Sequence, residues 1–337
     1  MAEAMFKTLS LVFAATAIAT AEAALGQRVP CYFVFGDSVF DNGNNNVLNT
    51  SAKVNYSPYG NDFARGPTGR FSNGRNIPDI IAEQMRFSDY IPSFTGASPE
   101  QAHTGINYAS GGGGIREETS QHLGEIISFK KQIKNHRSMI MTAKVPEEKL
   151  NKCLYTINIG SNDYLNNYFM PAPYMTNKRF SFDEYADSLI RRARKLAVFG
   201  VSKLGCTPRM IASHGGGNGC AAEVNKAVEP FNKNLKALVY EFNRNFADAK
   251  FTFVDLFSGQ TPFAFFMLGF RVTDKSCCTV KPGEELCATN EPVCPARRRY
   301  VYWDNVHSTE AANMVVAKAA FTGLITSPYS LSRLARL

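Results

Sequence analysis

The chain has 337 residues, of which 45% are hydrophobic and 20% charged, and its formal net charge is +8. This length predicts one large domain or two small ones, and the hydrophobic share is enough to bury a full core. The low charged fraction excludes an intrinsically disordered chain and a coiled coil. The 25 glycines follow no three-residue period, which excludes a collagen-like chain.

The first 23 residues are ordered like a secretory signal peptide. A short segment ending at Lys7 precedes an uncharged run from Thr8 to Ala21, and Ala21-Glu22-Ala23 matches a cleavage signature. The run is shorter than the roughly 20 apolar residues that cross a bilayer, and no later stretch is apolar enough. We expect residues 1–23 to be removed and a single soluble, secreted domain over 29–337. The alternative is an N-terminal core helix.

The positive charge does not indicate a nucleic-acid binder. Removal of the leader takes away one lysine and two glutamates and moves the net charge from +8 to +9, which favours acidic surroundings such as a pectin-rich wall. The basic clusters are short and lack interleaved aromatic residues, so we interpret them as solvated faces. These clusters are Lys130-Lys131, Arg191-Arg192 and Arg297-Arg298-Arg299.

All eight cysteines follow the expected cleavage site, and an even number in an exported chain suggests disulfide bonds. Metal binding is the rival interpretation, but no C-x-x-C occurs and no histidine pair has the helical spacing of a zinc site. Asn49 and Asn55 each begin an N-x-Ser sequon and are candidate glycan acceptors.

Short apolar runs alternate with amphipathic stretches along the rest of the chain, without an internal repeat or a long linker. The expected strands are Tyr32–Phe35, Gly105–Ala109, Leu154–Ile159, Leu196–Val201 and Phe251–Leu256. Four helices are expected. One begins at Pro78, one contains Ile126, Phe129 and Ile133, one carries an apolar stripe from Val224 to Phe246 with a kink at Pro230, and one begins near Ser308. This alternation predicts a parallel sheet covered on both faces, with the ligand site at the carboxyl ends of the strands.

Ser38 follows the first expected strand in the sequence Phe33-Val34-Phe35-Gly36-Asp37-Ser38. A tight turn at this point can expose a hydroxyl at the start of a helix, where backbone N–H groups favour negative charge. A turn serine or a helix N-cap is the commoner case for such a residue on sequence grounds alone. A second segment, Asp41-Asn42-Gly43-Asn44-Asn45-Asn46, follows directly.

Asp304 and His307 stand three residues apart near the other end of the chain. A carboxylate at this spacing can hold the imidazole in one tautomer while its other nitrogen faces a nucleophile. A lone histidine is more often structural. Among the five histidines only His307 has an aspartate at this spacing and a partner motif elsewhere.

Two further segments could supply donors to an oxyanion. They are Asn107-Tyr108-Ala109-Ser110-Gly111-Gly112 and Gly160-Ser161-Asn162-Asp163. A glycine N–H and an asparagine amide suit this role, although a Gly-Gly pair alone usually marks a loop and a loop asparagine usually caps a turn. There is no G-x-S-x-G elbow and no P-loop sequence after the glycine run.

Together these four segments resemble the plant GDSL esterase/lipase family of the SGNH hydrolase superfamily, from Cys31 to about Leu337. The matching blocks are Cys31 to Ser38, Asn107 to Gly112, Gly160 to Tyr164 and Trp303 to His307. The resemblance implies a flavodoxin-like three-layer α/β/α fold with a five-stranded parallel sheet. It also implies a secreted carboxylic ester hydrolase that forms an acyl-enzyme and needs no metal or cofactor.

The resemblance assigns roles to individual residues. Ser38 is the nucleophile, His307 the general base and then acid, and Asp304 the residue that orients His307. The oxyanion donors are the Ser38 N–H, the Asn162 amide and a glycine N–H, which we place at Gly111 with Gly112 as the alternative. An acyl lipid, a polyester or an acylated polysaccharide could be the ester substrate, and the sequence leaves the oligomeric state open.

In the flavodoxin-like order the first strand lies beside the third, and Cys31 and Cys153 stand immediately before these two strands. Parallel neighbours lie about 4.8 Å apart, so we expect a Cys31–Cys153 disulfide. Cys206 and Cys220 flank a glycine-rich loop and are the second expected pair. The remaining four cysteines are too clustered to pair from the sequence.

The chain also departs from the family pattern. Ser308 stands where members usually have a proline, and it can cap the following helix. About three helical turns are missing near 191–196, and the stretch 127–152 is also short, which could weaken the packing of one sheet face. An acyltransferase on the same residues and a non-catalytic wall or defence protein are the alternative functions.

Overall fold

The computed structural model describes residues 27–170, 174, 197–216, 219–245 and 250–337. The expected signal peptide and the expected shortening near 191–196 lie outside these residues. No helix among the described residues is both long and apolar enough to cross a membrane.

The main sheet has five strands in the order β1-β2-β3-β4-β7. The first four run parallel, and β7 pairs antiparallel with β4. Their bounds are Tyr32–Gly36 for β1, Leu154–Asn158 for β2, Ala197–Phe199 for β3, Thr252–Val254 for β4 and Thr326–Ser327 for β7. The expected α/β fold with a five-stranded sheet is therefore confirmed, but the sheet is not wholly parallel as expected, because β7 runs antiparallel to β4. The first expected strand lies beside the third, with Tyr32 paired with Leu154 and Gly36 with Asn158.

The segment 105–109 is not a regular strand, and β7 takes the fifth place in the sheet instead. The segment does run along β1, since the amide of Val34 donates to the carbonyl of Ile106 and that of Tyr108 to Val34. Gly105 has φ of +135°, and a Cβ there would lie 2.0 Å from the Tyr32 carbonyl oxygen. This close approach and positive φ break the pleat, so apolar content alone did not make the segment a strand.

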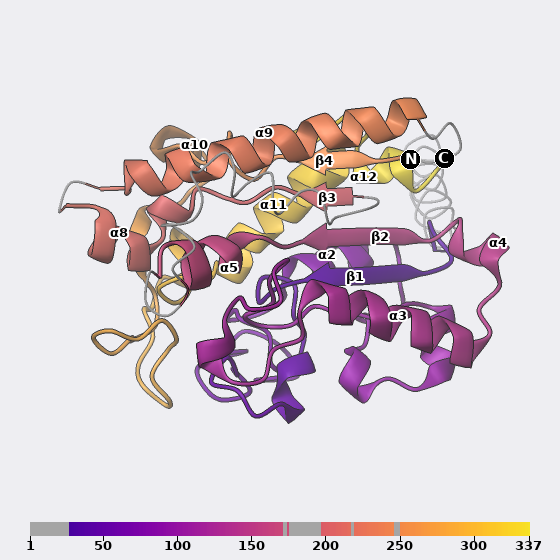
Figure 1. Ribbon diagram of the computed structural model, residues 1–337. Helices are drawn as coiled ribbons and strands as arrows, with labels where there is room; N and C mark the ends of the chain where they lie inside the picture. The colour runs from indigo at the N-terminus through magenta and orange to yellow at the C-terminus, as the bar shows by residue number, and fades with distance from the viewer. Residues whose placement is uncertain (1–26, 171–173, 175–196, 217–218, 246–249) are drawn as a thin grey trace, which may run out of the picture.

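Helices cover both faces of the sheet, which gives the expected three layers (Figure 1). One face packs Phe33 and Phe35 against α3 and α9, and the other packs Tyr32 and Val34 against α2 and α11. The helices are α2 (Ile77–Gln84), α3 (Phe129–Ala143), α4 (Glu147–Leu150), α5 (Ser161–Asp163), α8 (Pro208–His214), α9 (Ala222–Asn245), α10 (Pro262–Met267), α11 (Glu310–Thr322) and α12 (Leu331–Leu334). Alternate residues of β1 thus face opposite layers, as a strand requires.

The helix boundaries follow local capping chemistry. Asn76 caps α2 in a reciprocal capping box with Asp79, and Pro78 stands in the first turn as expected. Helix α9 continues through Pro230. The last long helix begins at Glu310 with Thr309 as its N-cap, so Ser308 is not the cap that the sequence suggested. Ser308 instead forms a bridge with Tyr302.

A small second sheet and four disulfides complete the fold. Strands β5 (Val272–Ser276) and β6 (Tyr300–Tyr302) pair in parallel. The expected Cys31–Cys153 and Cys206–Cys220 bonds are both present, and the clustered cysteines form Cys277–Cys294 and Cys278–Cys287. The carboxyl ends of β2, β3 and β4 lead into α5, α8 and α10, which lie together at the left end of the sheet in Figure 1.

Candidate active site

Ser38, His307 and Asp304 form one hydrogen-bonded chain although 269 residues separate the serine from the histidine. His307 Nε2 lies 2.8 Å from Ser38 Oγ, and His307 Nδ1 lies 2.8 Å from Asp304 Oδ2. All three side chains are buried, with Ser38 at 8% exposure. This is the arrangement in which an imidazole can take a proton from a serine hydroxyl while a carboxylate holds its other nitrogen.

The end of β1 places Ser38 at this point. Gly36 pairs with Asn158 of β2, and the amide of Asp37 donates to the Asn158 carbonyl. The chain then turns, because the amides of Phe40 and Asp41 both donate to the Asp37 carbonyl. Ser38 therefore sits on a tight turn after a buried strand as expected, although a turn rather than a named helix follows it directly.

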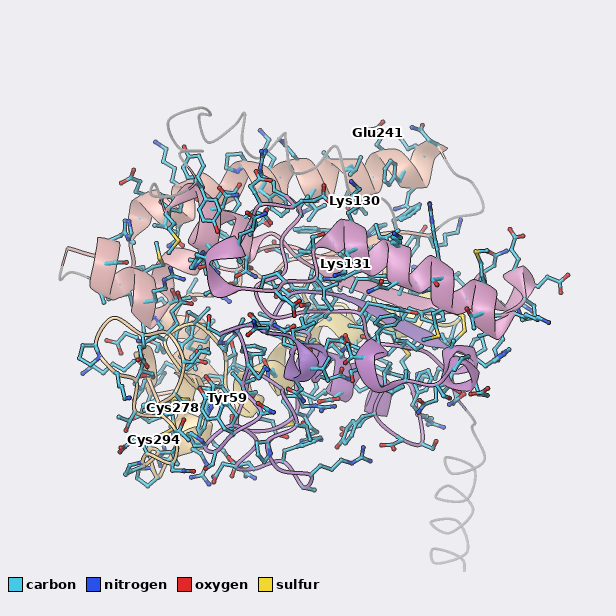
Figure 2. All side chains as sticks on the ribbon, turned by 60° about the horizontal axis from the view of Figure 1, so that its bottom comes forward. Tyr59, Lys130, Lys131, Glu241, Cys278 and Cys294 are labelled. Atoms are coloured by element: carbon cyan, nitrogen blue, oxygen red, sulfur yellow. A yellow bond between two sulfur atoms is a disulfide. The ribbon has the colours of Figure 1, made fainter. Side chains whose placement is uncertain are left out.

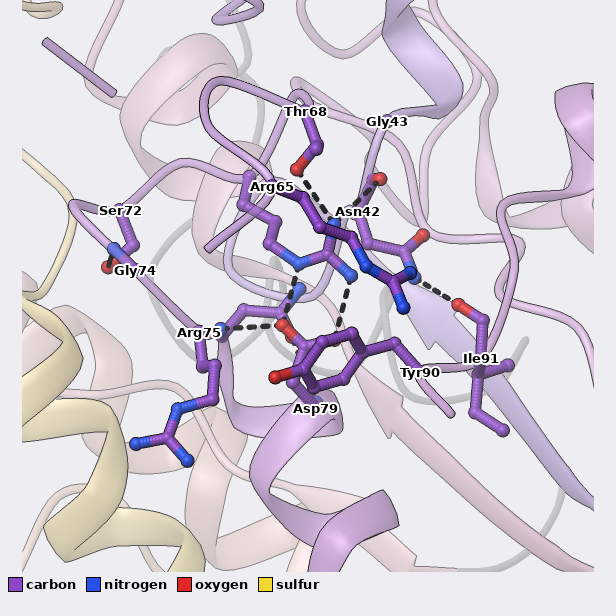
Figure 3. Close-up of polar contacts among 12 residues, drawn as sticks. Asn42, Gly43, Arg65, Thr68, Ser72, Gly74, Arg75, Asp79, Tyr90 and Ile91 are labelled. Carbon is purple, nitrogen blue, oxygen red and sulfur yellow. Dashed lines mark hydrogen bonds and ion pairs between the residues drawn. The ribbon is translucent and has the colours of Figure 1, made fainter. Parts of the chain in front are cut away.

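The segment after this turn is anchored to the start of α2. A buried, two-pronged ion pair joins Arg70 to Asp79, with 2.6 Å between Nε and Oδ2. Arg70 also donates to the Asn42 carbonyl, and the Asn42 amide donates to the Ile91 carbonyl. Figure 3 shows this polar cluster, with Asp79 at the N-terminus of its helix and Asn42 reaching Ile91. The backbone behind Ser38 is thus tied to a helix.

Asp304 is held in place by more than His307. The amides of Val306 and His307 both donate to Asp304 Oδ1, and the Tyr59 phenol donates to Oδ2 at 2.7 Å. The Tyr59 oxygen in turn accepts from the amide of Cys287. These donors compensate the burial of the carboxylate.

Tyr59 could not be singled out from the sequence, because it lies 245 residues from Asp304 and belongs to no motif. Tyr59, Cys278 and Cys294 belong to one packed cluster, and their side chains lie near one another in Figure 2. The disulfide-bonded segment thus supports the aspartate from behind.

The electrostatics of His307 suit a general base. Burial alone would lower its pKa, but the Asp304 carboxylate, by charge and hydrogen bond, raises the pKa above the ordinary value of 6.5. The Phe71 ring packs on the imidazole with centroids 4.8 Å apart. The histidine is therefore oriented by a carboxylate on one nitrogen and by an aromatic ring on its face.

Asn162 lies at the same edge of the sheet as Ser38, because β1 and β2 end in register at Gly36 and Asn158. Its Nδ2 donates to the Gly113 carbonyl at 3.0 Å, and its Oδ1 accepts from the Asn166 amide at 2.8 Å. An asparagine amide has two donor hydrogens, so one remains for a ligand. Asn162 thus lies at the sheet edge that carries Ser38, and its role as an oxyanion donor stays a prediction.

Further contacts connect Asn162 to the loop of the triad. Arg209 of α8 donates to Asn166 Oδ1 at 3.1 Å and forms an ion pair with Glu285. The Arg209 amide also donates to the Asn305 carbonyl, next to Asp304 in sequence. Arg209 therefore links Asn166, the partner of Asn162, to the loop that carries Asp304.

The glycine loop lies between Asn162 and His307. A Cβ built on Gly111 would lie 2.6 Å from the Phe71 ring that covers His307, while the next residue but one, Gly113, accepts from Asn162. The Gly111 amide, however, donates to Asp41 Oδ2 at 2.9 Å. An N–H already bonded to a buried carboxylate is a poor choice for an oxyanion donor, so this geometry does not favour Gly111.

The asparagine-rich segment after Ser38 holds this loop. Asn44 donates to the carbonyls of Asn107 and Ala109, and Asn45 donates to the Gly111 carbonyl at 2.9 Å. Ser110 donates to Asn45 Oδ1. These contacts of the asparagines were not predicted from the sequence, although the asparagines follow Ser38 closely along the chain.

Three buried aspartates lie around the site, and burial raises the pKa of each. The pKa of Asp37 rises to about 7, and those of Asp41 and Asp163 to about 6. Asp163 accepts from the amides of Ile115 and Arg116 and so joins the end of the glycine loop to the helix that carries Asn162. Within the described residues no cluster of three or more histidine, cysteine or acidic side chains could hold a metal ion.

Comparisons with known proteins place the chain in a family. Residues 32–320 match the family model described as GDSL-like Lipase/Acylhydrolase. The chain belongs to this family. It is 90% identical to the GDSL esterase/lipase At2g19050 of Arabidopsis thaliana over the full length of both chains. It is 75% identical to the GDSL esterase/lipase At2g19060 of the same plant, over 98% of this chain and 99% of the relative. The expected enzyme class, a carboxylic ester hydrolase, is confirmed by this membership.

The alignment also bears on the expected shortening. It spans 349 positions with the first relative, whereas this chain has 337 residues, so at least 12 aligned positions have no residue here. That size fits about three helical turns at roughly 3.6 residues per turn. The place of the shortening near 191–196 stays a prediction. The stretch 127–152 contains α3 and α4, and Phe129 and Val145 within it are buried.

Proposed function

We propose that this protein is a secreted serine esterase or lipase that hydrolyses carboxylic esters through an acyl-enzyme on Ser38. The observation that carries the proposal is the 2.8 Å contact between Ser38 Oγ and His307 Nε2, with Asp304 on the other nitrogen. A serine hydroxyl is a weak nucleophile at neutral pH, and an adjacent oriented imidazole is what activates it. The eight cysteines, all paired in disulfides, and the leader-like N-terminus support export of the chain to the cell wall or apoplast.

The steps follow from the contacts. Ser38 Oγ attacks the ester carbonyl carbon while its proton moves to His307 Nε2. The tetrahedral intermediate collapses when the alcohol leaves with that proton, and the acyl group stays on Ser38. Water then attacks the acyl carbonyl, gives a proton to His307, and the carboxylic acid departs as Ser38 regains its proton. Asp304 keeps its charge and stabilises the imidazolium at each stage.

We place the glycine oxyanion donor at Gly112. The carbonyl of Gly111 and the N–H of Gly112 belong to one peptide, and in a trans peptide they point in opposite directions. Asn45 binds that carbonyl at 2.9 Å, so the Gly112 N–H points away from Asn45. Among the hydrogen bonds of the described residues, none is donated by the Gly112 N–H. Together with the Ser38 N–H and the free hydrogen of Asn162, it would bind the oxyanion.

The substrate is an ester, and acyl lipids, polyesters and acylated polysaccharides all fit this chemistry. An acyltransferase would use the same residues with an alcohol in place of water, and a non-catalytic protein would keep them without turnover. Purified wild-type protein and Ser38→Ala should be given a panel of esters in water, with and without an added alcohol. Hydrolysis by the wild type alone supports the proposal. Transfer to the alcohol in preference to water, or equal activity of Ser38→Ala, contradicts it.

A further inference from the structure

Helix α10 and the residue that caps its end, Leu268, expose several large apolar side chains to solvent. Phe263, Phe266, Met267 and Leu268 are large apolar residues that are each more than half exposed, up to 75% for Phe263. We call these four residues the α10 patch. Single exposed apolar residues are common on soluble proteins, but several adjacent ones mark an interaction surface.

The α10 patch belongs to a well-anchored element. Thr261 caps the helix by accepting from the Ala264 amide at 3.1 Å. Phe265 on the opposite side packs against Phe270, with ring centroids 5.9 Å apart, in a cluster with Val301. The helix therefore buries one side in the protein, and its other side is held outward by that packing.

Positive charge borders the patch. The Arg271 guanidinium lies 4.3 Å from the centroid of the Phe266 ring and also donates to the Phe266 carbonyl. The Arg271 amide donates to the Arg299 carbonyl, which brings the exposed residue Arg299 next to Arg271 in space. Within the part of the chain that the structure describes, neither of these two arginines forms an ion pair.

The patch lies at the same end of the sheet as the candidate active site. Helix α10 follows the carboxyl end of β4, as α5 with Asn162 follows that of β2, and both helices lie at the left end of the sheet in Figure 1. Gln260, just before α10, accepts from the amide of Lys203 in the loop after β3. A surface that contacts the patch would therefore face the edge that carries Ser38.

We propose that the α10 patch and its arginines dock the protein on an anionic lipid surface. An apolar helix face enters the boundary between headgroups and acyl chains, and neighbouring cations meet lipid phosphates. Charge complementarity favours this occupant, since the rim is cationic and the whole chain carries +8. The binding is independent of catalysis, whereas its benefit, delivery of lipid esters to Ser38, rests on the proposed function.

The test is co-sedimentation of the full-length mature protein with vesicles of phosphatidylcholine and phosphatidylglycerol in equal parts. The double variant Phe263→Ser, Phe266→Ser should bind on the order of a hundredfold more weakly, from about tenfold for each aromatic side chain. Arg271→Gln should lose about fivefold, and added salt should weaken the wild type more than this variant. Leu324→Ser, at a site 83% exposed elsewhere on the surface, is the matched control and should bind like the wild type.

Hydrolysis of a short, water-soluble ester separates the two proposals. The patch variants should hydrolyse it at the wild-type rate, and a wild type that binds vesicles but hydrolyses no ester would reject the proposed function alone. Three results would overturn the proposed docking on lipid: no vesicle binding by the wild type, unchanged binding by the double variant, or an equal loss of binding in Leu324→Ser. A wild type that binds no vesicles but forms a concentration-dependent dimer, which the double variant abolishes, would also overturn it.

Discussion

The phenol of Tyr59 donates a 2.7 Å hydrogen bond to Oδ2 of Asp304, the same oxygen that lies 2.8 Å from His307 Nδ1. The carboxylate charge is thus shared between a neutral donor and the imidazole. A neutral donor disperses that charge and reduces its effect on His307. We therefore expect Tyr59 to act as a positioning residue and to moderate the pKa of His307, the proposed general base.

Replacement of Tyr59 by phenylalanine tests this relationship. Tyr59→Phe should lower kcat about tenfold, the order of magnitude for one hydrogen bond to a buried charged group. The acid limb of the kcat/KM profile should move to higher pH. Without the hydrogen bond from Tyr59, the negative charge of Asp304 acts more strongly on His307 and raises its pKa further. A purely structural role would lower kcat without moving this limb. A pH–rate series on both proteins decides between the two.

The disulfide next to Tyr59 should matter for catalysis as well as stability. Cys278 is bonded to Cys287, whose amide donates to the Tyr59 oxygen, so the paired serine variant should lower both kcat and Tm. The matched control removes Cys206–Cys220, a bond of similar loop length that touches neither Tyr59 nor Asp304. Both variants should lose about 2–4 kcal/mol of stability. Equal kcat for the two folded variants would show that the first bond does not support the triad.

The orientation of the glycine loop can be tested at Asn45. Asn45→Ala removes the donor that holds the Gly111 carbonyl, so kcat should fall on the order of tenfold with KM little changed. Asn46→Ala is the matched control, because Asn46 donates to the Thr68 carbonyl instead. For comparison, loss of a donor itself in Asn162→Ala should cost roughly 10²–10³-fold. An Asn45 variant with normal kcat would argue against Gly112 as the oriented donor.

The contribution of Asp37 to stability should fall as the pH rises from about 4 to about 7. Burial raises the pKa of Asp37 to about 7 from 3.8, so the folded state holds a proton that the unfolded state has released. This contribution is complete below about pH 4 and is lost as the pH rises towards 7. The side chain in Asp37→Asn cannot ionise. Between pH 5 and pH 8 the free energy of unfolding should therefore fall less in this variant than in the wild type, by about 2–3 kcal/mol. Calorimetry of both proteins at pH 5 and pH 8 measures this difference. An equal loss of stability in the wild type and in Asp37→Asn would contradict the prediction.

The buried imidazole of His136 should have the opposite effect over part of the same pH range. Burial lowers the pKa of the His136 imidazole to about 4, so its contribution is complete above 6.5 and is lost as the pH falls through 4. Between about pH 4 and 6.5 the gain from His136 therefore opposes the loss from Asp37.

The contact among Ser38, Asp304 and His307 was predictable because each residue stands beside a strong local signal. Ser38 follows a buried strand, and Asp304 and His307 share one short loop. The strand order then placed Cys31 and Cys153 together, as the disulfide confirms. These inferences needed only short-range spacing and one topological rule.

The remaining parts depend on contacts that spacing does not encode. Tyr59 reaches Asp304 across 245 residues, and the pairing of the clustered cysteines depends on how their loop folds over Trp303. The choice between Gly111 and Gly112 depends on where Asp41 and Asn45 point. The apolar residues of 105–109 predicted a strand, whereas Gly105 has a positive φ that interrupts one.

The central claim is that Ser38 is the nucleophile, and its most direct test is covalent labelling. Wild-type protein should be treated with a fluorophosphonate, digested and analysed by mass spectrometry, with His307→Ala and Ser38→Ala alongside. We predict one adduct, on Ser38, that is absent from Ser38→Ala and much slower to form in His307→Ala, because the serine then lacks its base. An unlabelled wild type, or an adduct on another residue that survives in Ser38→Ala, would contradict the account.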